Sequence, residues 1–195
     1  MVDGSDYSLV SIDTSTGNTA AVASITCDKP AGIAGDGTNT WIVGKNVSAE
    51  DCLYKYNGTV FDTDENGYPK QHSNLVQVDT ISRDGSSLYF HNSNILLPVI
   101  GTINTTDGST TALLTGGPGG PPDFARTKHI AVVSGEYYTT FSTGGGWCEI
   151  RKLNSGGVAL KRYFTPVNNT GPVTMKNGSL YIIHGNPNRL YIISP

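Results

Sequence analysis

Four segments of this chain repeat one pattern, in which a run of apolar residues leads through a tight turn into a second apolar run. Glycines at positions 37, 85, 135 and 178 mark the turns, so successive turns lie 43 to 50 residues apart. Each run is rich in Val, Ile, Tyr, Phe, Leu or Thr and is bounded by Gly, Asn, Asp or Ser, which is typical of strands joined in β-hairpins. Recurrence at this spacing indicates one supersecondary unit that is used several times.

Asn-Gly and Asp-Gly pairs support the prediction of hairpins. Such pairs tolerate the positive φ angles that the two central residues of a tight hairpin turn require. They occur at Asp36-Gly37, Asn57-Gly58, Asn66-Gly67, Asp84-Gly85, Asp107-Gly108 and Asn177-Gly178. Each of these pairs is therefore predicted to be a turn between strands.

Further strands are expected after each hairpin. The first three units continue with strand-like runs at 52–56 and 59–62, 95–100 and 110–114, and 148–153 and 158–164. The last unit continues only with the run at 189–193. We expect its missing outer strand or strands to come from an N-terminal hairpin, with strands at 7–13 and 18–25 joined by a turn at 14–17. Pairing the two ends of the chain in this way leaves no interior sheet edge exposed.

The composition agrees with an all-β class. Charged residues make up only 15% of the 195 residues and hydrophobic residues 37%, with 24 Gly and 10 Pro. A disordered chain needs high charge and few apolar residues, whereas a helical bundle is rich in Ala, Glu, Lys, Leu and Arg. No window of a dozen residues shows apolar periodicity near 3.6. These observations exclude both classes, and the length suffices for one sizeable core or two small ones.

We therefore predict an all-β fold, a small β-propeller of four blades, or of five if the run at 189–193 and the N-terminal hairpin belong to different units. Residues 1–195 would form a single domain with approximate units 27–74, 75–120, 121–168, and 169–195 together with 1–26. The pattern resembles a β-propeller over nearly the whole chain, and Ser8–Gly17 resembles the outer-strand hairpins of YncE-like bacterial propellers. Trp-Asp dipeptides, Kelch-type double glycines and complete FG-GAP motifs are absent, so no particular propeller family is indicated. The alternative is a β-sandwich or Greek-key fold with evenly spaced hairpins.

Charge and cysteine content limit the partners and the location. The net charge is −3 and no block of Lys and Arg stands out, whereas nucleic-acid binding needs a basic face. The N-terminal sequence has no basic segment followed by an apolar stretch, and the apolar runs are only a handful of residues long. We thus expect a soluble protein with no signal peptide, membrane span or nucleic-acid partner. Cys27, Cys52 and Cys148 are predicted to be free thiols, with a single disulfide as the alternative.

Asp62, Asp64 and Asn66 place side-chain oxygens at alternate positions, and the glycine that follows allows a sharp turn. Oxygens in this arrangement are suited to a hard cation such as Ca²⁺. The segment resembles the first half of the calcium loops of EF-hands and FG-GAP blades. The twelfth position, where the EF-hand has a bidentate Glu, is Ser73. We therefore expect a polar turn without a cofactor, and weak Ca²⁺ binding is the alternative.

Two histidines and two aromatic residues are further candidates. His91 and His184 each follow a turn glycine by six residues, which predicts matching blade positions that face each other near the axis. Two imidazoles there could hold a metal ion or an anion, but two ligands are too few for tight zinc binding. We therefore expect strand-end histidines with backbone partners, and a metal or anion site is the alternative. Tyr68 and Trp147 lie in or beside predicted loops and are candidates for contact with a sugar or a protein.

No catalytic residues are indicated. The chain contains no Gly-x-Ser-x-Gly motif and no P-loop, and no pair of its scattered carboxylates can be selected for glycoside hydrolysis. We predict a non-enzymatic structural or interaction module whose loop rims bind a protein, further copies of the chain or a surface glycan. The composition resembles that of bacteriophage virion proteins such as tail, fibre or decoration modules, which implies a place in a virion. The alternative is a small propeller hydrolase or lyase that acts on carbohydrate with a bound calcium ion.

Overall fold

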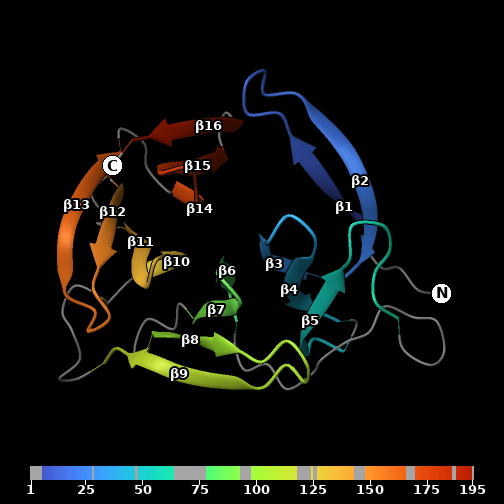
Figure 1. The fold of residues 1–195 in the computed structure, drawn as a ribbon, viewed down its shortest axis with the longest axis horizontal. Coiled ribbons are helices and arrows are strands. Elements are labelled where there is room, and N and C mark those ends of the chain that lie inside the picture. Colours follow the sequence, from blue (N-terminus) through green and yellow to red (C-terminus); the bar gives the residue numbers. More distant parts are fainter. Residues whose placement is uncertain are drawn as a thin grey trace.

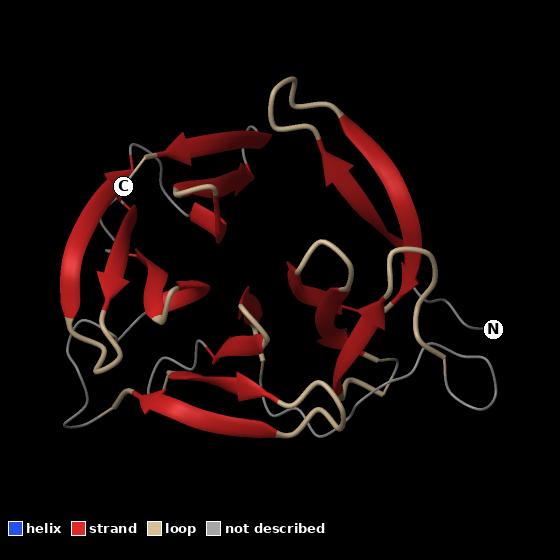
Figure 2. Ribbon diagram, viewed as in Figure 1, coloured by secondary structure: helices blue, strands red, loops and turns tan. Residues whose placement is uncertain are grey.

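The structure is a computed structural model that describes residues 6–27, 29–46, 48–63, 78–92, 98–117, 124, 127–142, 148–165, 170–185 and 188–194. The regular elements in these ranges are β-strands (Figure 2). Within the same residues we find no helical segment with the length and apolarity that a membrane crossing requires. The predicted all-β class is confirmed.

The strands of the described residues form five antiparallel sheets in which neighbours in the chain are neighbours in space. The first sheet is the hairpin of β1 (Asp6–Ile12) and β2 (Thr19–Thr26). The second contains β3 (Lys29–Gly35), β4 (Thr40–Lys45) and β5 (Asp51–Tyr56). The third contains β6 (Thr80–Asp84), β7 (Ser87–Asn92), β8 (Val99–Ile103) and β9 (Thr110–Thr115). The fourth contains β10 (Thr127–Val133), β11 (Glu136–Ser142), β12 (Cys148–Leu153) and β13 (Ala159–Thr165), and the fifth contains β14 (Thr170–Lys176), β15 (Ser179–Gly185) and β16 (Asn188–Ile193).

The sheets are arranged around a common centre, with β3, β6, β10 and β14 innermost in their sheets (Figure 1). Each inner strand packs against the next, β3 on β6, β6 on β10 and β10 on β14. Apolar side chains fill the space between adjacent sheets. Between the second and third sheets, for example, the cluster contains Trp41, Val43, Leu53, Ile81, Leu88, Phe90 and Ile103. This radial packing of small antiparallel sheets is the β-propeller that the repeat predicts.

Local sequence explains the tight turns between the inner strands. Between β14 and β15, Asn177 and Gly178 both have positive φ angles, 51° and 76°. Asn and Gly adopt this backbone region at little steric cost, so the turn matches the twist of the two strands it joins. The predicted turn at Asn66-Gly67 lies outside the described residues.

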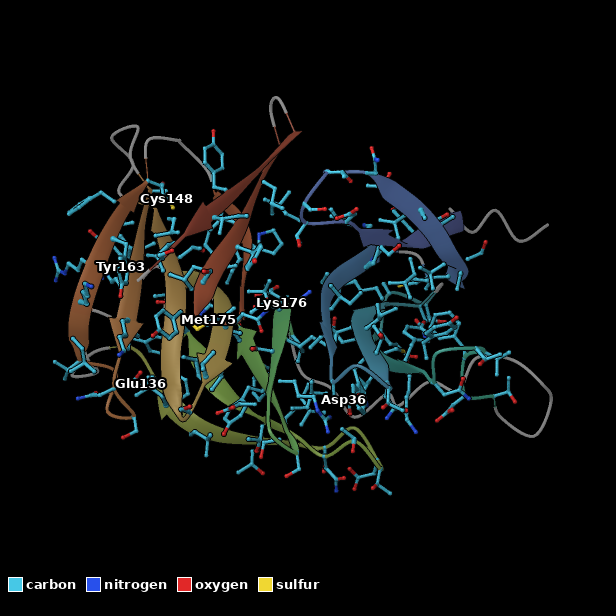
Figure 3. The ribbon with its side chains drawn as sticks, turned by 45° about the horizontal axis from the view of Figure 1, so that its top comes forward. Asp36, Glu136, Cys148, Tyr163, Met175 and Lys176 are labelled. Atoms are coloured by element: carbon cyan, nitrogen blue, oxygen red, sulfur yellow. The ribbon has the colours of Figure 1, made fainter. Side chains whose placement is uncertain are left out.

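The inner turns also connect adjacent sheets through side chains. The carboxylate of Asp36 (labelled in Figure 3) lies 3.3 Å from the guanidinium of Arg83 in the next sheet, and that guanidinium lies 4.3 Å above the ring of Trp41. One sheet further on, the carboxylate of Asp84 accepts the backbone N–H of Gly135 at 2.9 Å. Polar contacts of this kind help to set the position of each sheet against the next.

Equivalent positions in the sheets are found by counting from the pair of residues that closes each inner hairpin. The closing pairs are Asp36–Asn39, Asp84–Ser87, Val133–Glu136 and Lys176–Ser179. Because side chains alternate along a strand, residues at equal distance from the closing pair face the same way in their sheets.

The predicted ring closure and blade count are not confirmed. The hairpin β1–β2 forms a sheet of its own and pairs with no other described strand, although the sequence predicts that it pairs with the C-terminal sheet. The predicted strand at 59–62 is only an isolated bridge between Tyr56 and Phe61. The reason is local: the side-chain oxygen of Asn57 accepts the backbone N–H groups of Thr59 and Val60 and so holds this stretch in a turn.

The three cysteines are buried, and none of them forms a disulfide. The thiol of Cys27 donates a hydrogen bond to the backbone carbonyl of Lys45 at 3.3 Å. Its sulfur atom occupies the space that a side chain at Gly44 would fill. A glycine at this position therefore allows the segment between β2 and β3 to lie directly on β4.

Candidate functional site

One rim of the propeller is formed by the strand ends at which the chain enters each sheet. The strands β6, β10 and β14 begin at this rim with Thr80, Thr127 and Thr170, and β7 and β11 end at it. The connections 93–97 and 143–147 follow β7 and β11 and lie outside the described residues. Tyr68 and Trp147 also fall outside them, so their contact with a partner stays a prediction.

His91, at the rim end of β7, is fully buried and belongs to the packing between two sheets. Its Nε2 atom lies 2.8 Å from the hydroxyl oxygen of Thr127. That hydroxyl donates to the backbone carbonyl of Phe124 at 3.0 Å, so its oxygen accepts from His91 and the imidazole carries its hydrogen on Nε2. The imidazole also meets the ring of Phe124 edge to face, with centroids 5.8 Å apart. In this position His91 joins β7 to the start of the next sheet.

Burial lowers the pKa of His91 to about 4 and that of His129, near the start of β10, also to about 4. The ordinary value is 6.5, so as the pH falls the unfolded chain takes up protons on these residues before the folded protein does. The contribution of the two neutral histidines to the free energy of unfolding is therefore fully present above pH 6.5, and it is lost as the pH falls from 6.5 to about 4.

We expect the melting temperature to fall steadily between pH 6.5 and pH 4.5, as measured by circular dichroism. NMR titration of the imidazole protons should find both histidines neutral in the folded protein at pH 5.5. In the variant His129→Gln, residue 129 does not titrate, so the melting temperature should fall less over the same pH range. A melting temperature that is constant over this pH range would contradict the burial of these imidazoles.

The structure does not place His91 and His184 at equivalent positions. His91 lies four residues after the closing residue Ser87, whereas His184 lies five residues after Ser179. The residue that is equivalent to His91 in the C-terminal sheet is Ile183. The difference arises because Gly85 is the first residue of its two-residue turn and Gly178 is the second, so a count from the glycines shifts the register by one residue.

Of the predicted calcium ligands, only Asp62 lies in the described residues. Its carboxylate is 3.3 Å from the ammonium group of Lys55, and its backbone N–H donates to the carbonyl of the same lysine. Asp64 and Asn66 lie outside the described residues, so weak Ca²⁺ binding stays a prediction. Within the part of the chain that the structure describes, no group of three His, Cys, Asp or Glu side chains is suited to hold a metal ion.

The fourth sheet contains a buried ion pair that the sequence analysis did not predict. Glu149 and Arg151 lie two residues apart on β12, are only 4% and 6% exposed, and form a hydrogen-bonded ion pair. The guanidinium of Arg151 lies 3.4 Å above the ring of Phe141 on β11. Arg151 is also directly opposite Arg162 of β13, an arrangement that repulsion between like charges opposes. The carboxylate of Glu149 reduces this repulsion because it lies between them, 4.0 Å from Arg162.

The outer strand next to this ion pair presents a mixed apolar and cationic surface. Leu160, Arg162 and Phe164 alternate along β13, and we call them the β13 patch. Phe164 is 67% exposed although it lies directly opposite the buried Glu149. Tyr163, between Arg162 and Phe164, packs instead in the core against the C-terminal sheet (Figure 3).

The β13 patch lies close to the rim. The end of β13 is held there by the hydroxyl of Thr165, which donates to the carbonyl of Cys148 at 2.9 Å. Cys148 follows the predicted contact residue Trp147 directly in the chain. The alternation of Arg162 and Phe164 in the sequence is the signal that could have revealed the patch, because it places both side chains on one face of a strand. Leu160 lies at the bulge of β13, where no residue of β12 is opposite it. The exposure of these three side chains depends on which strand is outermost, which the sequence does not state.

The chain matches no protein-family model and none of the curated proteins. Its fold is similar to that of a chain in the nidogen/laminin complex, with a TM-score of 0.62 and 12% identity over 95% of this chain and 84% of that one. A glutaminyl cyclase from Myxococcus xanthus (TM-score 0.56, 10% identity, 90% of this chain and 77% of that one) is also similar. So is a gluconolactonase from Xanthomonas campestris (TM-score 0.55, 14% identity, 95% of this chain and 64% of that one). These neighbours are β-propellers that include both interaction modules and enzymes, and at such identities they show the fold alone.

Proposed function

We propose that the protein is a non-enzymatic interaction module that binds a partner at its rim and at the β13 patch. The observation that carries this proposal is the exposure of Phe164 and Arg162 beside the buried ion pair of Glu149 and Arg151. A large exposed aromatic side chain next to a guanidinium is the combination that is enriched at the energetic centres of protein interfaces.

Two ionisable groups near the rim are engaged by structural partners, which supports a binding role over a catalytic one. Glu149 is paired with Arg151, and His91 with Thr127. A general acid or base must be free to exchange a proton with a substrate. The low pKa of His91 keeps its imidazole neutral at pH 7, and its Nε2 hydrogen is donated within the protein.

The chemistry of the patch suggests the kind of partner. Leu160 and Phe164 offer apolar contact, and Arg162, which is about half exposed, offers a planar cation to a carboxylate. We propose a protein surface that carries an acidic group beside an apolar side chain, and a surface glycan with acidic sugars is the second form of partner. The bacteriophage virion suggested by the composition is the proposed setting, in which many copies would be present on one particle.

Binding to an array of bacterial surface glycans and to purified virion proteins tests this proposal. We expect Phe164→Ala to weaken binding at least tenfold. The matched control Leu113→Ala removes a similarly exposed apolar side chain from the outer strand β9 and should leave binding unchanged. Equal effects of the two variants would contradict a specific role for the β13 patch.

The same protein should release no reducing ends and form no unsaturated products from a panel of polysaccharides, with or without calcium. Turnover that is abolished by the single change Asp62→Asn would replace the proposal by the alternative, a carbohydrate-active enzyme with a calcium site. The solved enzymes among the propellers of similar fold are the reason to include this assay.

A further inference from the structure

The N-terminal hairpin has the geometry of the outer half of a blade. Its turn contains two backbone hydrogen bonds, Asp13 N–H to the Asn18 carbonyl and Gly17 N–H to the Asp13 carbonyl. The turn between β8 and β9, the third and fourth strands of their sheet, has the same two bonds at the same spacing, from Asn104 to Ser109 and from Gly108 to Asn104.

The match extends into the strands. A bulge interrupts the register of β1 and β2 between Leu9 and Val10, four and three residues before the turn residue Asp13. The bulge in β8 and β9 lies at the same distance before Asn104, between Ile100 and Gly101. The hairpin β1–β2 is therefore equivalent to β8–β9, the third and fourth strands of a sheet, whereas the C-terminal sheet has only three strands in the described residues.

In the third sheet, β8 pairs along its inner edge with β7, and β7 with β6. No described strand pairs with the corresponding edge of β1. The hairpin nevertheless packs where the outer half of a blade belongs, because Leu9 contacts the core cluster that contains Ile42 and Tyr54 of the second sheet. The inner half of this blade, two strands joined by a turn, is therefore missing from the described residues.

The inner strand that faces this position is uncovered. Ile33 of β3 is equivalent by register to Ile81, Ile130 and Val173 of the other inner strands. Those three side chains are 4%, 2% and 5% exposed because each packs against the preceding sheet, whereas Ile33 is 54% exposed.

The opposite wall is uncovered in the same way. Ile183 of β15 is equivalent to Val43, His91 and Thr140, which are each at most 1% exposed. Val43 and His91 pack against the following sheet. Ile183 is 44% exposed. Figure 1 shows β3 and β14 as the innermost strands on the two sides of the region that β1–β2 borders from outside.

We propose that this position, which we call the blade slot, binds a two-stranded β-hairpin of a separate polypeptide. One strand of that hairpin pairs with the inner edge of β1, and apolar side chains on both of its faces cover Ile33 and Ile183. Addition of strands to an exposed sheet edge is an established mode of recognition. A second copy of this chain has no spare inner hairpin in its described residues, because each one is already part of a sheet. The slot is distinct from the rim and the β13 patch, so this proposal does not depend on the proposed function.

A synthetic peptide with the sequence of Gly171–Ile183, the inner hairpin of the C-terminal sheet, is a suitable probe. In the third sheet, Gly101 of β8 lies against the large ring of Phe90 on β7. The residue of β1 that is equivalent to Gly101 is Val10, which leaves less room for the side chain opposite it. The probe carries the smaller Ile182 in the position of Phe90 and is therefore preferred to the hairpin β6–β7. We expect calorimetry to find a dissociation constant of about 1 to 100 μM, and a scrambled peptide should not bind.

Variants of the full chain locate the binding. Ile33→Asp and Ile183→Asp place a charge on either wall and should each weaken peptide binding at least tenfold. They should fold normally because both side chains are exposed in the structure. Leu113→Asp, at a similarly exposed position on β9, should bind the peptide like the unaltered chain, and so should Phe164→Ala, which tests the rim function separately.

Two results would overturn the proposal. One is absence of peptide binding in calorimetry by the folded chain. The other is a dimer in analytical ultracentrifugation that Ile33→Asp converts to a monomer, because the occupant of the slot would then be a second copy.

Discussion

Glu149→Ala should lower the free energy of unfolding by about 3 to 5 kcal/mol, the largest effect that we expect from a single substitution. The change leaves the guanidinium of Arg151 buried without its carboxylate, because the residue is only 6% exposed. It also removes the negative charge that lies between Arg151 and Arg162 on adjacent strands. The contact with Phe141 remains and compensates only in part, since a cation–π contact is worth about 0.5 to 2 kcal/mol. Unfolding in urea, followed by circular dichroism, measures the difference.

The control is the double variant Glu149→Leu/Arg151→Met. It removes both charges at similar volume and should lie within about 2 kcal/mol of the original protein, because replacement of a complete buried ion pair by apolar residues is often neutral or stabilising. If Glu149→Ala lowers the free energy of unfolding by less than about 1 kcal/mol, the ion pair is solvated in solution. The β13 patch would then not lie beside a buried ion pair.

Ile81→Ala should lower the free energy of unfolding by about 2 to 5 kcal/mol, whereas Ile33→Ala should change it by no more than about 0.5 kcal/mol. The two residues are equivalent in the repeat and chemically identical. Ile81 lies in the core between the second and third sheets, so its truncation leaves a cavity. Ile33 faces the blade slot and loses little contact when it is shortened. Denaturant unfolding of both variants under the same conditions gives the comparison.

This pair tests whether the ring is open at β3. Ile130→Ala serves as a second buried control and should resemble Ile81→Ala, because its side chain is 2% exposed at the equivalent position of β10. A loss at Ile33 as large as that at Ile81 would mean that part of the protein covers β3 in solution, and the blade slot would then not exist.

The repeated hairpins could be predicted because their signals are local. An Asn-Gly pair such as Asn177-Gly178 specifies its own backbone angles, and alternation of side chains in the following residues specifies a strand. The same local character explains two errors. Counting from turn glycines placed His184 in the register of His91, although the glycines occupy different positions in their turns. The run at 59–62 has the composition of a strand, but the side chain of Asn57 holds it in a turn.

The candidate sites were less predictable, because they depend on which strands become neighbours. From the sequence alone, Glu149 and Arg151 would be expected to be solvated charges on an ordinary strand. They are buried because β13 and Phe141 enclose them. Phe164 has a large apolar side chain of the kind that usually lies in a core. It is exposed because β13 is the outermost strand of its sheet. Neither outcome can be read from the residues in sequence order.

Class, repeat length and turn positions thus follow from short-range chemistry, since each residue in a turn or strand favours its conformation whatever lies beyond its near neighbours. Burial, register between sheets and the uncovered walls at Ile33 and Ile183 follow from packing across the fold. Identical isoleucines at equivalent positions, 33 and 81, differ in exposure by half of their surface. Their local sequence patterns are alike, and the difference comes from the presence or absence of a neighbouring sheet.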